Sequence, residues 1–205
     1  MAKSSDILIS THICKRNKTH QTFKNFISAD FRTIKTGNPH EYVKTCWSNY
    51  ETNCPKSQRT QSLNGKIFET IIASCLYREN ILPMFLQAKV TFVPNVDFDI
   101  VLFKEEKRSP IGISIKTSLR ERYKQADLEA VALKYVHRNA ENYLISLQSS
   151  EVDSVKQKLT DGSLLGLNRI IAADTKEFDE LIAELKTKTF INPGEVPIIT
   201  GTLIK

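Results

Sequence analysis

The sequence predicts an α/β domain with a mixed β-sheet of about five strands, covered by helices on both faces. The 205-residue chain is 40% hydrophobic with only seven glycines and seven prolines, which favours a packed core over a disordered or fibrous protein. No internal repeat or low-complexity tract is present. Segments typical of strands alternate with segments of helical periodicity, in the order helix, three strands, helix, strand, helix, strand, helix.

The first firm helix is expected over residues 64–80. Ile67, Ile71 and Leu76 recur there at helical spacing, and Asn64 stands at a capping position. The segment before it differs in character.

Residues 1–60 are polar, rich in Asn, Thr and Lys, and contain scattered aromatic residues. This composition is typical of short helices or an arm outside the main core. The chain is therefore expected to form one domain, with an N-terminal helical or arm region at 1–60 and a core at 61–205.

The remaining elements alternate along the chain. Strands are expected at residues 88–93, 98–103, 111–117, 142–147 and 168–173. Helices are expected at residues 119–138, 152–159 and 176–186, the last beginning at Asp174 or Thr175. Helices between strands of one sheet cover both of its faces.

The charge of the chain favours a polyanionic partner. The formal net charge is +6, and basic residues lean toward the first sixty positions. Phosphate contacts by lysine and arginine release counterions, so we expect nucleic acid before a membrane surface. No stretch approaches the ~20 apolar residues of a membrane helix, and the first residues lack the apolar core of a secretory signal, which indicates a cytoplasmic protein.

Four cysteines, Cys14, Cys46, Cys54 and Cys75, show no compact paired spacing. We interpret them as reduced, packed thiols. A zinc site of Cys14, His20, Cys46 and Cys54 is the alternative, but its gaps match no common ligand spacing.

Two helical acids, Glu69 and Glu129, fall on the apolar stripes of their predicted helices. Each has hydrophobic residues three, four and seven positions further on. Either acid could lie at the edge of its stripe and face water. Because a buried charge is costly unless something pairs with it, two such acids suggest a shared partner.

The predicted strands supply further charged groups. Asp97 and Asp99 are expected on one face of their strand, and Ser114 and Lys116 on one face of its neighbour. Carboxylates and a lysine that converge at strand ends suit phosphodiester hydrolysis. The acids hold one or two Mg²⁺ ions that activate water, and the lysine orients that water or neutralises developing charge.

Over roughly residues 60–150 this pattern resembles the PD-(D/E)XK nucleases, and within them the restriction endonucleases of the EcoRII, SsoII, PspGI and NgoMIV group. In that group a small residue often replaces the acid before the catalytic lysine, and a glutamate of the following helix supplies the carboxylate. Ser114 occupies the vacated position, and Glu129 follows Lys116 by thirteen residues. The resemblance implies a restriction-endonuclease-like α/β/α core.

The same resemblance implies the roles of the site residues. Asp99, Lys116, Glu129 and Glu69 are the expected catalytic residues. Mg²⁺ is the expected cofactor, and its expected ligands are Asp99, Glu129, Ile115 and Glu69. Asp97 remains the alternative to Asp99.

An Arg-Glu-Arg element, Arg120, Glu121 and Arg122, stands four to six positions after Lys116, as in that group. Arginine forks onto guanine O6 and N7, and a carboxylate accepts from cytosine N4. The resemblance therefore implies a type II site-specific deoxyribonuclease that cleaves double-stranded DNA at a palindrome with CC and GG half-sites, of the CCGG or CCNGG type, as a homodimer. The alternative is a solvated helix start.

Other residues are assigned more loosely. Gln58 and Gln61 are expected to contact outer base pairs. Trp47, the only tryptophan, either packs in the core or stacks on DNA or an extruded base. Two other classes remain open: a repair or recombination nuclease of the same fold, such as a junction resolvase, and a non-catalytic DNA-binding protein.

Overall fold

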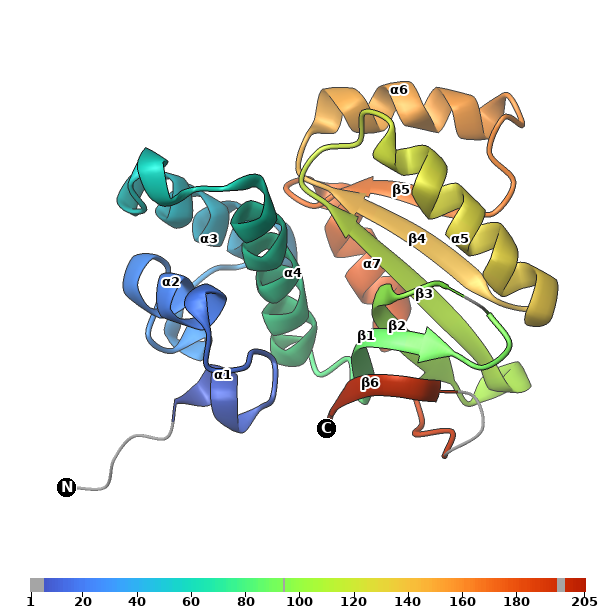
Figure 1. Ribbon diagram of the computed structural model, residues 1–205, viewed down its shortest axis with the longest axis horizontal. Coiled ribbons are helices and arrows are strands. Elements are labelled where there is room, and N and C mark those ends of the chain that lie inside the picture. The colour runs from blue at the N-terminus through green and yellow to red at the C-terminus, as the bar shows by residue number, and fades with distance from the viewer. Residues whose placement is uncertain (1–5, 94, 195–197) are drawn as a thin grey trace.

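A computed structural model describes residues 6–93, 95–194 and 198–205. It contains a six-stranded mixed sheet in the order β5-β4-β3-β2-β1-β6 (Figure 1). The strands are β1 Met84–Val90, β2 Phe98–Lys104, β3 Ser109–Lys116, β4 Glu141–Ser146, β5 Arg169–Ala172 and β6 Ile198–Ile204. β3, β4 and β5 are parallel to one another, and the other neighbouring pairs are antiparallel.

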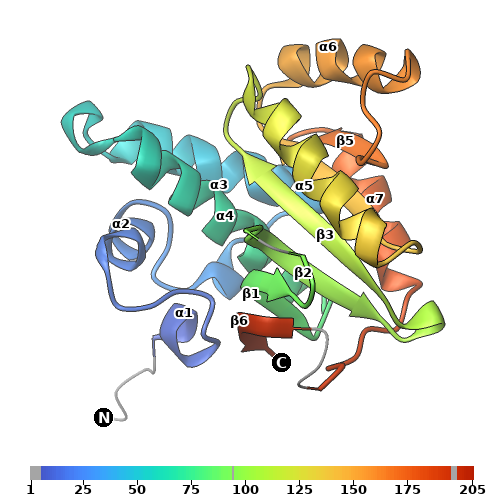
Figure 2. The same ribbon diagram turned by 45° about the vertical axis from the view of Figure 1, so that its right-hand side comes forward.

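Helices cover both faces of this sheet. The α-helices are α1 Ile7–Ser10, α2 Lys18–Phe26, α3 Pro39–Asn53, α4 Gln61–Arg78, α5 Arg122–Val136, α6 Ser149–Thr160 and α7 Lys176–Lys186. Short 3₁₀ helices occupy η1 Phe31–Thr33, η2 Lys56–Gln58 and η3 Glu106–Arg108. Helices α3, α4 and α7 lie on one face, and α5 and α6 lie on the other (Figure 2). Most of the buried apolar side chains of these two groups of helices belong to two separate core clusters. The predicted mixed sheet between two helical layers is confirmed.

The N-terminal helices belong to the main core. Within residues 6–60 the structure contains helices α1, α2 and α3 and the 3₁₀ helices η1 and η2, and large side chains of this segment lie in the core and not in an arm outside it. Phe23, Phe31, Tyr42 and Tyr50 are fully buried in the same cluster as the apolar residues of α4 and the central strands. Sparse aromatic residues in a polar segment thus provide large buried surfaces.

Several predicted boundaries differ from the structure by three or four residues, and two of them have a clear local cause. Helix α4 begins at Gln61, because Thr60 is the N-cap and its side chain accepts from the Leu63 N–H at 3.2 Å. Asn64 lies inside the helix and accepts from the Tyr50 hydroxyl at 2.6 Å. Strand β1 begins at Met84, four residues before the expected start at residue 88. The sequence did not show this earlier part as a strand, because an irregularity at Gln87 interrupts the alternation of side chains that is typical of a strand.

Strand β6 was not predicted. It pairs antiparallel with the far edge of β1, so that the sheet has six strands where about five were expected. All four cysteines are free and buried, as packed thiols should be. Among the described residues, no helix combines the length and the apolar character needed to cross a membrane.

Candidate active site

Asp99 and Lys116 form an ion pair where β2 and β3 separate. Lys116 Nζ lies 2.9 Å from Asp99 Oδ2, and the Ile115 N–H donates to the same oxygen at 2.7 Å. The regular pairing of the two strands ends at Ile100 and Ile113, so the Ile115 N–H has no partner in that ladder. Asp99 takes the place of the missing strand partner, which fixes its carboxylate beside Lys116.

Glu69 joins this pair from α4, on one face of the sheet. Gln87 of β1 connects the two acids: its Nε2 lies 3.1 Å from Glu69 Oε2 and 3.3 Å from Asp99 Oδ1. Lys66, one helical turn before Glu69, binds Glu69 Oε2 at 2.8 Å. Lys66, Glu69, Gln87 and Asp99 line a cavity of about 240 Å³, and residues 12–15 of the N-terminal region line it too.

Glu129 approaches from α5, on the opposite face. Its side chain is half-buried and accepts from Gln125 Nε2 at 2.7 Å. The charges of Lys116, Asp99 and Asp97 all act on it. The two helical acids that the sequence singled out therefore belong to helices on opposite faces of the sheet, and the charges of Asp99 and Lys116 act on both.

Both helical acids have a perturbed pKa. Burial raises the pKa of Glu69, and the negative charge of Asp99 raises it further, against the opposing effect of Lys66. Burial likewise raises the pKa of Glu129, while the Gln125 amide and Lys116 act in the lowering direction. The site thus holds negative charge at a cost in free energy, as functional sites often do.

The chemistry of these donors fits a hard divalent cation. Among the residues described, no three His, Cys, Asp or Glu side chains stand close enough to form a metal site in their present rotamers. The available donors are the carboxylate oxygens of Glu69, Asp99 and Glu129 and the carbonyl of Ile115, the oxygen ligands that Mg²⁺ prefers. The three acids also outnumber the two lysines that neighbour them.

Asp97 acts on Glu129 through its charge but forms its ion pair outside this cluster. It precedes β2, its side chain is 58% exposed, and its ion-pair partner is Lys89 at 3.8 Å. Asp99, and not Asp97, therefore contacts Lys116. Ser114 is buried in β3, two residues before Lys116 and so on the same face of the strand.

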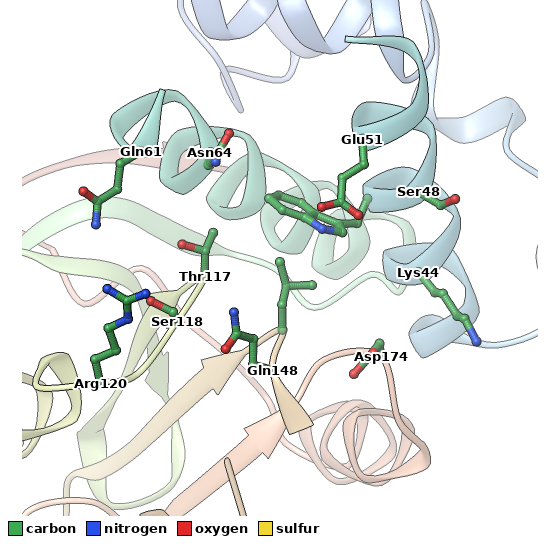
Figure 3. Close-up of a pocket in the computed structure, with 12 residues that line it drawn as sticks. Lys44, Ser48, Glu51, Gln61, Asn64, Thr117, Ser118, Arg120, Gln148 and Asp174 are labelled. Carbon is green, nitrogen blue, oxygen red and sulfur yellow. The ribbon is translucent and has the colours of Figure 1, made fainter. Parts of the chain in front are cut away.

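A cleft of about 720 Å³ opens between α3, α4 and the loop that follows β3. Figure 3 shows Gln61 and Arg120 at one end of it and Lys44 at the other. Trp47 also lines the cleft while its ring packs against Tyr50 and Phe68, with centroids 5.3 and 5.9 Å apart. Trp47 is thus partly buried against the core and also forms part of the cleft wall.

The Arg-Glu-Arg element is exposed at the start of α5. Arg120 and Glu121 lie in the turn before the helix, and Arg122 is its first residue. Arg120 has a left-handed backbone, with φ of 32°. The Leu119 N–H donates to Glu151 of α6, which ties this turn to the neighbouring helix. Gln58 is exposed on η2, outside the group of residues that line the cleft.

Three residues at or near the site were not predicted from the sequence: Lys66, Gln87 and Glu151. Lys66 had a detectable signal, because it lies three residues before Glu69 on the same helical face. Gln87 and Glu151 had none, since their roles depend on the strand irregularity and on the packing of α6 beside the loop after β3.

The sequence matches neither a protein-family model nor a curated protein. Solved structures do resemble the chain. The restriction endonuclease PspGI in complex with substrate DNA aligns with a TM-score of 0.51 and 17% identity, over 85% of this chain and 77% of that one. Metal-depleted Ecl18kI in complex with uncleaved, modified DNA aligns with a TM-score of 0.51 and 16% identity, over 89% of this chain and 81% of that one. The chain therefore has a restriction-endonuclease-like α/β fold.

Proposed function

We propose that the protein is a type II restriction endonuclease that cleaves double-stranded DNA with Mg²⁺. The observation that carries this proposal is the Asp99–Lys116 pair flanked by Glu69 and Glu129, at strand ends of a restriction-endonuclease fold. Acids and a lysine in this arrangement supply what phosphodiester hydrolysis needs: oxygen ligands for a cation and a positive group near the reacting phosphate.

In this proposal Asp99, Glu129, Glu69 and the Ile115 carbonyl hold the cation. When bound, Mg²⁺ polarises the phosphate and lowers the pKa of a water. Lys116 orients the attacking water or neutralises charge that develops on the phosphate oxygens. The Ile115 N–H holds the Asp99 carboxylate in place for both tasks.

Recognition is proposed for the cleft and the loop after β3. Arg120, Glu121 and Arg122 are exposed and consecutive at the start of α5, which suits contact with base edges in the major groove. Gln61 lines the cleft beside Arg120 and is proposed, with Gln58, for outer base pairs. The proposed target is a palindrome with CC and GG half-sites, of the CCGG or CCNGG type, bound by a homodimer.

Incubation with plasmid DNA and Mg²⁺ tests the activity. We expect discrete fragments whose mapped ends share one short palindrome, and no cleavage by Asp99→Ala or Glu129→Ala. Diffuse products would favour a repair or recombination nuclease of the same fold. Binding without cleavage by the wild-type chain would favour a non-catalytic DNA-binding protein.

Recognition is tested separately with Arg122→Ala, in Ca²⁺ to support binding without cutting. A bidentate arginine contact is worth about 1–3 kcal/mol of discrimination, so affinity for the mapped site should fall much more than affinity for random duplex. Lys18→Ala, in the basic N-terminal region, is the matched control and should weaken both duplexes alike. If Arg122→Ala lost affinity for both duplexes equally, Arg122 would contact only phosphates. The proposed CC/GG recognition would then be contradicted.

A further inference from the structure

Gln87 has an unusual backbone for a residue within a strand. Its φ is 50°, in the left-handed region that glycine adopts freely and other residues adopt at a cost. It lies in β1 between Leu86, which pairs with Ile100, and Ala88, which pairs with Phe98, and so stands opposite Asp99. The pairing of β1 with β6 is also irregular just after Leu86.

This backbone directs the Gln87 side chain to the two acids of the proposed site. Its Nε2 is the shared hydrogen-bond donor to Glu69 Oε2 at 3.1 Å and Asp99 Oδ1 at 3.3 Å, and its Oε1 accepts from Lys66 Nζ at 3.3 Å. A carboxamide nitrogen carries two hydrogens, one for each acid. Gln87 is exposed, so apolar burial does not account for its conformation.

We propose that Gln87 is a positioning residue that holds Glu69 and Asp99 together for a divalent cation. This inference rests on the proposed function. Two carboxylates repel one another, and without the shared donor the flexible Glu69 side chain would turn away from Asp99 toward solvent. The Gln87 amide offsets that repulsion while no cation is present, so that both acids already face the same cavity. Ligands oriented in advance bind a cation with less loss of conformational entropy.

Two variants distinguish the effect of the Gln87 side-chain amide from the effect of its strained backbone. Gln87→Gly accepts the observed φ without strain and removes the amide, whereas Gln87→Ala keeps the strain and removes the same amide. Gln157→Ala is the control, because Gln157 also donates an exposed amide to a carboxylate, that of Asp161 at 3.0 Å, but outside the site. Thermal unfolding checks that each variant is folded.

The readout is the affinity for Ca²⁺ alone and for Mg²⁺ alone, measured by calorimetry without DNA. Loss of a partner that orients a metal ligand typically weakens affinity about 10- to 100-fold, and we expect this in both Gln87 variants but not in Gln157→Ala. A merely structural role would lower the unfolding temperature of Gln87→Ala without changing the cation affinity of Gln87→Gly.

Unchanged or tighter cation binding by Gln87→Gly would overturn the inference, because the amide would then be idle or a competitor of the cation. Failure of the wild-type chain to bind either cation would overturn the proposed metal-dependent function and this inference with it.

Discussion

Two clusters of charge lie at opposite ends of the same sheet, and they are organised differently. The Asp99 cluster contains Lys66, Glu69, Gln87, Asp99, Lys116 and Glu129. The Glu141 cluster contains Lys104, Glu141, Tyr143, Arg169, Glu184 and Lys188. In the first cluster three acids meet two cationic side chains, and in the second two acids meet three.

The carboxyl groups respond to this difference. In the Asp99 cluster, burial raises the pKa of Glu69 and Glu129. In the Glu141 cluster burial opposes ionisation too, but hydrogen bonds from Lys104 and Tyr143 outweigh it and lower the pKa of Glu141. The Glu141 cluster therefore stabilises the fold by itself. The Asp99 cluster lacks positive charge, as expected of a site that a cation completes.

Among the changes that compare the two clusters, the largest effect is expected for Lys116→Ala. DNA cleavage should fall about 10²- to 10³-fold, equal to about 3–4 kcal/mol, because a positive group near the developing charge is lost. The fold should persist, since Asp99 keeps its bonds from the Ile115 N–H and Gln87. Single-turnover cleavage and thermal unfolding of the same samples check this. Near wild-type cleavage would move the active site away from this end of the sheet.

Lys104→Ala is the matched change at the other end and should have the opposite profile. Lys104 is the buried partner of Glu141, so its loss should lower the free energy of unfolding by about 3 kcal/mol while single-turnover cleavage by the folded protein is retained. Denaturant unfolding measures the change.

The pH dependence sharpens this second prediction. Because the pKa of Glu141 is lowered in the folded state, its stabilising effect is present above the unfolded value near 4.5 and is lost as the pH falls through the folded value. The difference in unfolding free energy between wild type and Lys104→Ala should therefore narrow as the pH falls toward the lowered folded pKa of Glu141. A difference that does not change with pH would contradict an ionic origin.

The smallest effect is expected for Glu69→Gln, and it is a gain. Removing a charge that burial and Asp99 both disfavour should raise the free energy of unfolding by about 0.5–2 kcal/mol at pH 7 without divalent cation. The ion pair with Lys66 is also lost, but Lys66 is 47% exposed and contributes little. Glu180→Gln, an exposed acid on α7, is the control.

For Glu69 the stability changes above pH 4.5, the pKa of an unperturbed glutamate, because its folded pKa is raised. The folded protein binds the Glu69 proton more tightly than the unfolded chain, so wild-type stability rises as pH falls from the raised folded pKa toward 4.5. The advantage of Glu69→Gln should shrink over that range. A destabilised Glu69→Gln, or an advantage that grows on acidification, would show that Glu69 is well paired and that the two clusters do not differ as described.

Periodicity and residue type were enough to predict much of the architecture. The helix at 176–186 and the mixed sheet between helices follow from local patterns of apolar residues, because the spacing of these residues indicates secondary structure. The acids Glu69 and Glu129 were recognisable because a charge within an apolar stripe conflicts with that pattern. Asp99 and Lys116 were recognisable by their places at strand ends and by resemblance.

Only the tertiary structure decided which of these groups touch. The choice of Asp99 over Asp97 depends on where β2 and β3 part, and the role of Gln87 depends on an irregular strand that pairs on both edges. Strand β6 and the burial of Phe23 and Tyr42 likewise depend on surfaces that distant segments present. The sequence alone determined which groups carry charge and on which kind of element, because those depend on neighbours three or four residues away. Distances between carboxylates depend on packing across the whole sheet, so they cannot be predicted from a local sequence pattern.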